Sequence, residues 1–369
     1  MKIFHCDHCG HLLFFENTAC VGCRRRVAYL PDLQLIGSLD ADGDELWRSP
    51  LPQAVTEYRL CQNDKIEGIC NWAVPADDHN PLCMSCRITR VIPNLAEPAN
   101  RAAWYRLEAA KRRLIFTLIE LGLPMANRIE DPARGLAFEF LSDHERVTGP
   151  VLTGHANGVI TVNIAEADDA ERERRRTTMR EPYRTLLGHM RHESGHYYWD
   201  RLIRETSELD EFRSLFGDER ADYGESLRTY YEHGAPVDWQ IRFVSAYASA
   251  HPWEDWAETW AHYLHMVDTL ETAAACGLSL KPRRRDEPAM PDPPQPVSPQ
   301  PAAFEQLIDS WFPLTYVLNN LNRGLGLNDA YPFVLSPQAV AKLWFVDSVV
   351  GRSRVDGDVP ATQGEVPAT

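Results

Sequence analysis

The chain has 369 residues, 44% of them hydrophobic and 25% charged, which is enough to bury a large core in one good-sized domain with a smaller companion. Its formal net charge of −15 gives no overall attraction to nucleic acid. An apolar leader and a run of about 18 apolar residues are both absent, so the sequence gives no support to secretion or membrane spanning. We therefore expect a globular cytoplasmic protein without membrane contacts, for which a nucleic-acid partner is disfavoured.

The N-terminal quarter of the chain is rich in cysteine. Eight of the nine cysteines lie before residue 90, and because cytosolic thiols stay reduced, they indicate metal ligation rather than disulfides. Two CxxC pairs, ten residues apart, predict one zinc-ribbon site formed by Cys6, Cys9, Cys20 and Cys23. A second set with one wider spacing predicts another four-thiolate zinc site formed by Cys61, Cys70, Cys83 and Cys86.

Both predicted cysteine sites are structural, because four thiolates leave no position at the metal for water or substrate. We expect residues 1–95 to form a module of small metal-held turns, since this segment has little helical periodicity and much Gly, Pro and Asn. Side chains between the cysteines, including Phe14, Phe15 and Trp72, either pack or form a docking surface for a protein partner. The sequence leaves both alternatives open.

A second domain is predicted over residues 100–350. It opens after Pro98 with a long amphipathic helix. Segments 135–141 and 158–164 are predicted strands of one small sheet and are expected at its exposed edge. Further helices are expected at roughly 183–204, 208–216, 219–232, 238–249, 253–273, 303–322 and 336–350. The predicted fold class is α+β, with a zinc-ribbon module ahead of a mainly helical domain that contains a small β-sheet.

Two segments are expected to lie outside the packed structure. Residues 281–301 are too rich in proline and polar side chains to pack, so they are predicted to form a mobile loop within the helical domain. Residues 351–369 are predicted to be a disordered tail.

The segment HESGH has two histidines four residues apart, with a glutamate directly after the first. On a helix, residues i and i+4 lie on one face, so His192 and His196 can bind one Zn²⁺ while Glu193 faces the water to be activated. His189 lies about 10 Å from His196 along such a helix, which is too far to bind the same ion. The motif therefore suggests a metal site, which also requires a suitable ligand from another part of the chain.

A catalytic zinc usually has three protein ligands and one open position. No third histidine follows His196 closely, so a carboxylate from a later helix is required. One predicted helical face offers four candidates, of which only one or two can reach a single ion: Glu254, Glu258, His262 and His265. The residues alone leave the choice between the two glutamates open.

The segment HESGH followed by YASAHPWEDWAE resembles the glutamate-zincin metallopeptidases. The likeness is to their lethal-factor-like branch, in which a tyrosine lies seven residues before a helical E-x-x-A-E core. The chain as a whole is also similar to a bacterial family of zinc-binding metallopeptidases with an N-terminal zinc ribbon. This second likeness is carried by the phrases KRRL, TGH..GVITVNIAEADD, EPYRTLLGH.RHESGHYYWD, FGDERADY and HPWEDWAETWAHYLH. It implies a zincin-like metallopeptidase domain over residues 100–350.

The resemblance also implies a role for each site residue. His192, His196 and Glu254 become the zinc ligands, and Glu193 becomes the general base. Tyr247 becomes the donor that stabilises the oxyanion. Glu258 is then expected to hydrogen-bond a ligand histidine and fix its tautomer.

The expected function is zinc-dependent hydrolysis of peptide or related amide bonds in a peptide or protein substrate. One catalytic and two structural zinc ions are expected per chain. Strand 158–164 is expected to pair with an extended substrate, as an exposed edge strand can. The alternative is a zinc-stapled adaptor, in which the ribbon module binds a protein partner and the zincin-like part is an inactive scaffold.

Overall fold

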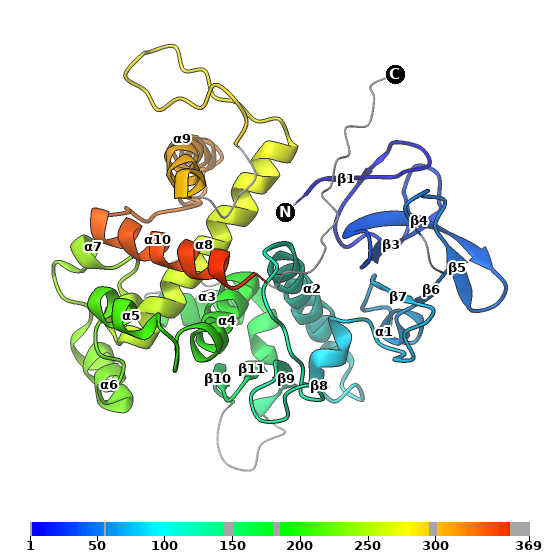
Figure 1. Cartoon of the computed structure of the whole chain (residues 1–369), viewed down its shortest axis with the longest axis horizontal. Coiled ribbons are helices and arrows are strands. Elements are labelled where there is room, and N and C mark those ends of the chain that lie inside the picture. The colour runs from blue at the N-terminus through cyan, green and yellow to red at the C-terminus, as the bar shows by residue number, and fades with distance from the viewer. Residues whose placement is uncertain (1, 55–56, 144–150, 180–184, 295–300, 355–369) are drawn as a thin grey trace.

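The computed structural model describes residues 2–54, 57–143, 151–179, 185–294 and 301–354. The long helix α2 (Pro98–Glu120) lies in the middle of the molecule, with the helical part on one side and the N-terminal strands on the other (Figure 1). Pro98 occupies the first turn of α2, where its missing N–H costs nothing. The predicted α+β class is confirmed.

The N-terminal part contains more regular structure than the expected metal-held turns. A two-stranded hairpin of β1 (Phe4–His5) and β2 (Leu12–Leu13) carries the first cysteine pair between its strands. An antiparallel sheet contains β3 (Arg26–Leu30), β4 (Leu35–Asp42), β5 (Leu46–Arg48), β6 (Glu57–Leu60) and β7 (Ala73–Pro75). Along the chain its first four strands lie between the two cysteine groups, and β7 lies between Cys70 and Cys83. A short helix, α1 (Gln62–Lys65), follows β6. The sheet was missed because its strands are short and separated by turns.

Aromatic side chains join the N-terminal part to α2. The ring centroids of Phe4 and Phe15 lie 6.2 and 5.5 Å from that of Phe116 on α2. Trp72 is also buried, whereas Phe14 is 67% exposed. Of the side chains whose role was left open, Phe15 and Trp72 therefore pack, and Phe14 faces solvent.

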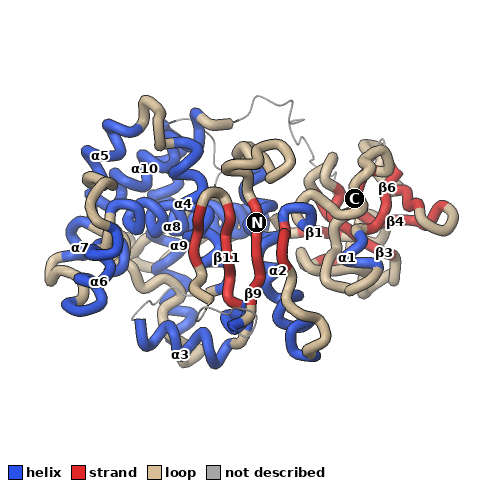
Figure 2. Tube along the Cα trace, turned by 90° about the horizontal axis from the view of Figure 1, so that it is seen from below, coloured by secondary structure: helices blue, strands red, loops and turns tan. Residues whose placement is uncertain are grey.

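A four-stranded sheet lies beside α2, in the order β10-β11-β9-β8. Its strands are β8 (Thr89–Val91), β9 (Ala137–Leu141), β10 (Gly154–Ala156) and β11 (Val159–Asn163). β8, β9 and β11 are parallel, and β10 runs antiparallel to β11. Figure 2 shows β11 and β9 side by side, between the helices and the N-terminal strands.

The expectation that segments 135–141 and 158–164 lie at the exposed edge of the sheet is wrong. β9 is paired on both sides, with β8 and with β11. β11 is paired on both sides, with β9 and with β10, and β10 occupies the edge. The two-residue turn Asn157-Gly158 folds β10 back onto β11, and both turn residues have positive φ, as this tight hairpin turn requires.

Apart from the helix over residues 169–179, which was not among those predicted, the remaining helices follow the predicted order with shifted ends. They are α3 (Asp169–Met179), α4 (Leu186–Leu202), α5 (Leu209–Phe216), α6 (Tyr223–His233), α7 (Trp239–Arg242), α8 (Pro252–Ala275), α9 (Pro301–Gly324) and α10 (Pro337–Arg352). The single helix predicted over 238–249 is wrong. α7 ends at Arg242, the backbone is extended at Phe243, and only a 3₁₀ turn (Tyr247–Ser249) follows.

α8 forms the centre of the helical core and packs tightly on α4. A Cβ on Gly195 would lie 2.9 Å from the Ala257 Cα, so glycine permits the close approach of the two helices. The indole N–H of Trp256 donates to the Gly195 carbonyl at 2.8 Å, and that of Trp260 donates to the Ser194 hydroxyl at 3.1 Å. These buried contacts set the register between α4 and α8.

Part of the predicted mobile loop is packed. Leu280 and Met290 form an antiparallel bridge, and Met290 is buried. Residues 295–300 lie outside the described residues, and α9 begins directly after them. The predicted disordered tail falls largely on residues 355–369, which also lie outside the described residues.

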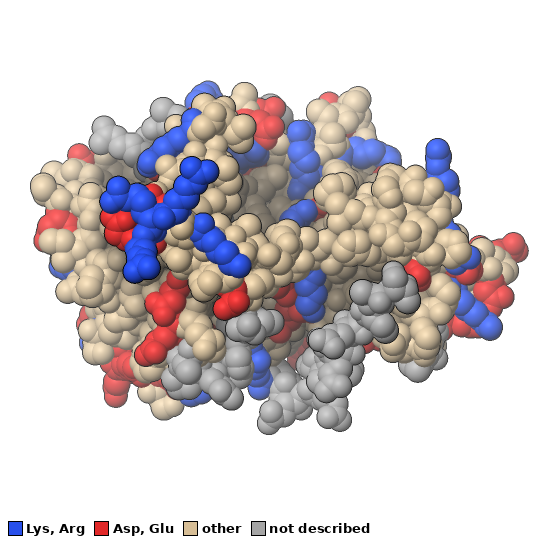
Figure 3. All heavy atoms as spheres, turned by 90° about the horizontal axis from the view of Figure 1, so that it is seen from above, with Lys and Arg blue, Asp and Glu red and all other residues tan. Residues whose placement is uncertain are grey.

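The surface carries interspersed charges. On the face drawn in Figure 3, Lys and Arg side chains lie in small separate groups among Asp and Glu. Among the described residues, no helix is both long enough and apolar enough to cross a membrane.

Candidate active site

α4 presents the two histidines of HESGH on one face. Thr185 caps the helix by accepting a hydrogen bond from the Gly188 N–H at 2.9 Å. His192 and His196 are one turn apart, and their ring centroids are separated by 5.0 Å. Both rings point toward the first turn of α8 and have little exposure.

Glu254 lies in the first turn of α8 and faces both histidines. Its Oε2 atom is 3.0 Å from the His192 Nε2, and its Oε1 atom is 3.6 Å from the His196 Nε2. The three side chains each offer one ligand atom, and these atoms all lie within 4.8 Å of one another. The structure thus brings together the three predicted ligands of the catalytic ion.

Glu258, one turn later on α8, contacts the other side of the first histidine. Its Oε1 atom is 2.7 Å from the His192 Nδ1, and its Oε2 atom accepts a hydrogen bond from the Ser245 hydroxyl at 2.5 Å. Of the other two candidates on this helix, His262 turns away and contacts the Tyr331 hydroxyl at 2.6 Å. His265 packs its ring against Tyr331 and Trp311.

The donor set fits a cation. When the Nδ1–H of His192 donates to Glu258, its Nε2 lone pair faces Glu254 Oε2, which has no hydrogen bond among the described residues. Two such acceptors attract each other only through a positive charge between them. Zn²⁺ bonds of about 2.0–2.1 Å in a tetrahedron put ligand atoms about 3.3 Å apart, close to the 3.0 and 3.6 Å found here.

The electrostatics agree with this fit. Burial disfavours a charged imidazole, yet the carboxylates of Glu254 and Glu258 raise the pKa of His192 well above its ordinary value. Burial likewise favours a neutral Glu254, but His196, His192 and the Tyr223 hydroxyl hold the pKa of this carboxyl at about 2. The site therefore favours positive charge at its centre, which a metal ion would supply.

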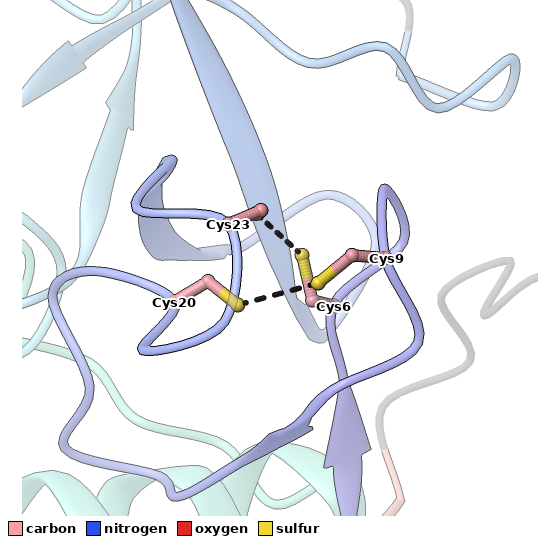
Figure 4. A group of neighbouring side chains, drawn as sticks. All are labelled: Cys6, Cys9, Cys20 and Cys23. Carbon is pink, nitrogen blue, oxygen red and sulfur yellow. Dashed lines mark hydrogen bonds between the residues drawn. The ribbon is translucent and has the colours of Figure 1, made fainter.

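The two cysteine groups have the geometry of four-thiolate zinc sites. In the first, Cys6 and Cys9 on one loop face Cys20 and Cys23 on another (Figure 4). The Cys6–Cys23 and Cys9–Cys20 sulfur distances are 3.7 and 3.6 Å, near the edge of about 3.8 Å for a tetrahedron with Zn–S bonds of about 2.3 Å.

The second group is more deeply buried than the first. It comprises Cys61, Cys70, Cys83 and Cys86. The sulfurs of Cys70 and Cys83 are 3.7 Å apart, again the tetrahedral spacing. Burial, together with the neighbouring thiols, raises the pKa of Cys83 well above its ordinary value, so four thiolates here require a cation to stabilise them.

Glu193 lies beside the histidine cluster and joins a chain of polar contacts. Its Oε1 atom is 3.3 Å from the His189 Nε2, and the His189 Nδ1 is 2.6 Å from Glu166 Oε2. Burial favours a neutral Glu193, but His189 and the charges of the nearby histidines lower the pKa of this carboxyl. His189 is outside the metal cluster, in agreement with its predicted distance.

Two tyrosines flank the cluster. The ring of Tyr247 lies 6.0 Å from that of His192, because the irregular segment after α7 turns it toward α4. Tyr223, at the start of α6, donates from its hydroxyl to Glu254 Oε1 at 2.7 Å. Sequence reasoning assigned no role to Tyr223, Glu166 or Ser245, although the quoted phrases FGDERADY and GVITVNIAEADD contain the first two.

These side chains surround one cavity of about 720 Å³. The metal cluster and Glu193 line it from α4 and α8, and residues 152–157 around β10 also line it. Aromatic side chains from several helices complete the lining, including Trp199, Tyr223, Tyr231 and Trp253. The cavity is large enough for several residues of a peptide.

Comparisons with known proteins bear on both parts of the chain. A family model described as "Putative zinc-binding metallo-peptidase" matches residues 100–349, and a zinc-ribbon domain model matches residues 3–97. Uncharacterised proteins of Mycobacterium bovis and Mycobacterium tuberculosis are 46% identical over 352 residues, which cover 95% of this chain and 95% of each relative. No solved structure matches.

Proposed function

The chain belongs to that zinc-binding metallopeptidase family, and from this premise we propose that it hydrolyses peptide or related amide bonds with a zinc-activated water. One observation carries the proposal. Glu193 lies directly beside the cluster of His192, His196 and Glu254, on the wall of a cavity that can admit a peptide.

Each residue near the cluster has a proposed role. His192, His196 and Glu254 hold the ion, which when bound supplies a Lewis acid that polarises the substrate carbonyl and acidifies water. Glu193 accepts the proton of the attacking water and delivers it to the leaving amine. The Tyr247 hydroxyl donates a hydrogen bond to the oxygen on which negative charge develops.

Glu258 has a supporting role in this proposal. By accepting the Nδ1–H of His192 at 2.7 Å, it keeps the Nε2 atom of that ring unprotonated for the metal. Ser245 in turn holds the second oxygen of Glu258, which fixes the carboxylate in place.

The substrate is proposed to bind along β10 rather than along β11. β11 is paired on both sides, whereas β10 has one paired strand among the described residues and lines the cavity. An extended peptide could add to this edge through main-chain hydrogen bonds, which would place a scissile bond opposite α4.

Purified protein is expected to carry three zinc ions per chain, one at His192 and His196 and two in the cysteine sites. A mild chelator should remove the first ion before the other two, because only the histidine site keeps an open position. Cleavage of an unbiased peptide library should then stop, while the circular dichroism spectrum stays largely unchanged. Adding zinc should restore cleavage. Cleavage that persists after the ion at His192 and His196 has been lost would contradict the proposal.

Glu254→Ala is expected to lose one zinc ion per chain. Glu258→Ala should keep that ion but bind it roughly 10- to 100-fold more weakly, as is usual when a residue that orients a ligand is removed. Competition with a chelator of known affinity, followed by metal analysis, measures both changes. The opposite pattern would make Glu258 the third ligand and would weaken the role given to Tyr247.

A further inference from the structure

His189 connects the proposed general base to a second buried carboxylate. Its two ring nitrogens contact different glutamates, with Nδ1 2.6 Å from Glu166 Oε2 and Nε2 3.3 Å from Glu193 Oε1. The Glu166 side chain is 1% exposed and that of Glu193 is 6% exposed. The imidazole is rigid, so fixing one nitrogen fixes the position of the other.

Glu166 is itself held on a rigid element. It lies in the 3₁₀ turn Ile164–Ala167, which follows β11 directly. Its other carboxylate oxygen accepts a hydrogen bond from the Thr153 hydroxyl at 2.7 Å, and Arg172 donates to its backbone carbonyl at 2.7 Å. The same Thr153 hydroxyl accepts the Asn163 N–H at 3.1 Å. The contacts therefore run from the sheet through Glu166 and His189 to Glu193.

We propose that His189, anchored by Glu166, is a positioning residue that holds one oxygen of Glu193 so that the other is aimed at the attacking water. The inference rests on the proposed function, because it concerns the base of that reaction. Glu193 Oε2 is buried and has no hydrogen bond among the described residues, as an oxygen kept for proton transfer should be. An unheld glutamate would sample several rotamers, and misplacement of a base lowers the rate of proton transfer.

A purely structural role is the competing explanation. In that case the His189–Glu166 pair only ties α4 to the turn after β11, and the contact with Glu193 is incidental. Asparagine and glutamine separate the two explanations, because the Asn amide reaches about as far as Nδ1 and the Gln amide about as far as Nε2. His189→Asn can therefore keep the contact with Glu166, and His189→Gln can keep the contact with Glu193.

The test compares zinc-loaded His189→Asn and His189→Gln with the wild type on one cleaved peptide. His189→Asn should lower kcat by roughly 10-fold or more with little change in KM or zinc content. His189→Gln should retain more of kcat than His189→Asn, because it loses only the contact with Glu166 that anchors the side chain, even if its melting temperature is lower. A KM held constant while kcat falls is not expected from a general loosening of the pocket.

Equal kcat values for His189→Asn and the wild type would overturn the inference. So would equal losses of kcat in His189→Asn and His189→Gln, if these losses parallel the decrease in melting temperature. Failure of the proposed function gives a different result, because the wild type itself would then show no cleavage that depends on Glu193. The two failures are therefore distinguishable in one set of measurements.

Discussion

Replacing Glu193 with Gln is expected to lower kcat by roughly 10²- to 10⁴-fold while all bound zinc is retained. Glutamine has the size and shape of glutamate but cannot accept a proton at neutral pH. Glu193 Oε1 lies 3.3 Å from His189 and outside the ligand cluster, so the substitution leaves the three proposed ligands untouched. Peptide cleavage by wild type and variant, at matched zinc content, measures the effect.

Asp200→Asn is the matched control for this experiment. Asp200 is on the same helix and lines the same cavity, so its amide variant removes an equal charge from the pocket. It should change kcat little, because no step of the proposed reaction uses this carboxylate. Equal cleavage by Glu193→Gln and the wild type would instead favour the adaptor, with the zincin-like part as a scaffold.

The local part of the site could be predicted from the sequence because it depends on a helical repeat. Residues four apart on α4 must share a face, and the structure has the two histidines of HESGH in that arrangement. The choice between Glu254 and Glu258 was open because it depends on how α8 is rotated and shifted against α4. That register comes from Gly195 and the indole hydrogen bonds of Trp256 and Trp260, which no helical pattern encodes.

The errors in the predicted fold have a similar origin, because they too depend on contacts between separate segments. Residues 154–156 have little intrinsic strand propensity, and they form β10 because the Asn157-Gly158 turn returns the chain onto β11. The periodicity over 238–249 predicted a helix, but the backbone is extended at Phe243. This break is what allows Ser245 and Tyr247 to reach Glu258 and the His192 ring.

The contacts around Glu166 could not have been found from spacing alone. Thr153 directly precedes β10, Glu166 lies in the turn after β11, and His189 lies on α4, so they meet only when the sheet packs on the helix. A buried carboxylate next to a strand has many explanations in a sequence, of which a contact with a histidine is one. Only the distances identify its partner.

The other large effect on kcat is expected for Tyr247, one of the two tyrosines near the cluster. Tyr247→Phe should lower kcat by roughly 10²- to 10³-fold, the loss typical of one oxyanion donor, with a much smaller change in KM. The ring is kept, so its packing against Tyr230 and His192 should persist and the melting temperature should hardly change. Steady-state kinetics of the zinc-loaded variant, with a thermal melt, measure both quantities.

Tyr223→Phe is the matched control, because it removes a hydroxyl from the same cavity. The Tyr223 hydroxyl is committed to Glu254 at 2.7 Å, so its loss should weaken zinc binding and cost ~1 kcal/mol of stability while kcat of the zinc-loaded enzyme falls far less. If Tyr223→Phe instead loses kcat and Tyr247→Phe loses only stability, the roles are exchanged and Tyr223 is the donor. The hydroxyl that stabilises the transition state is therefore identified by the variant in which kcat falls while zinc content and KM stay constant.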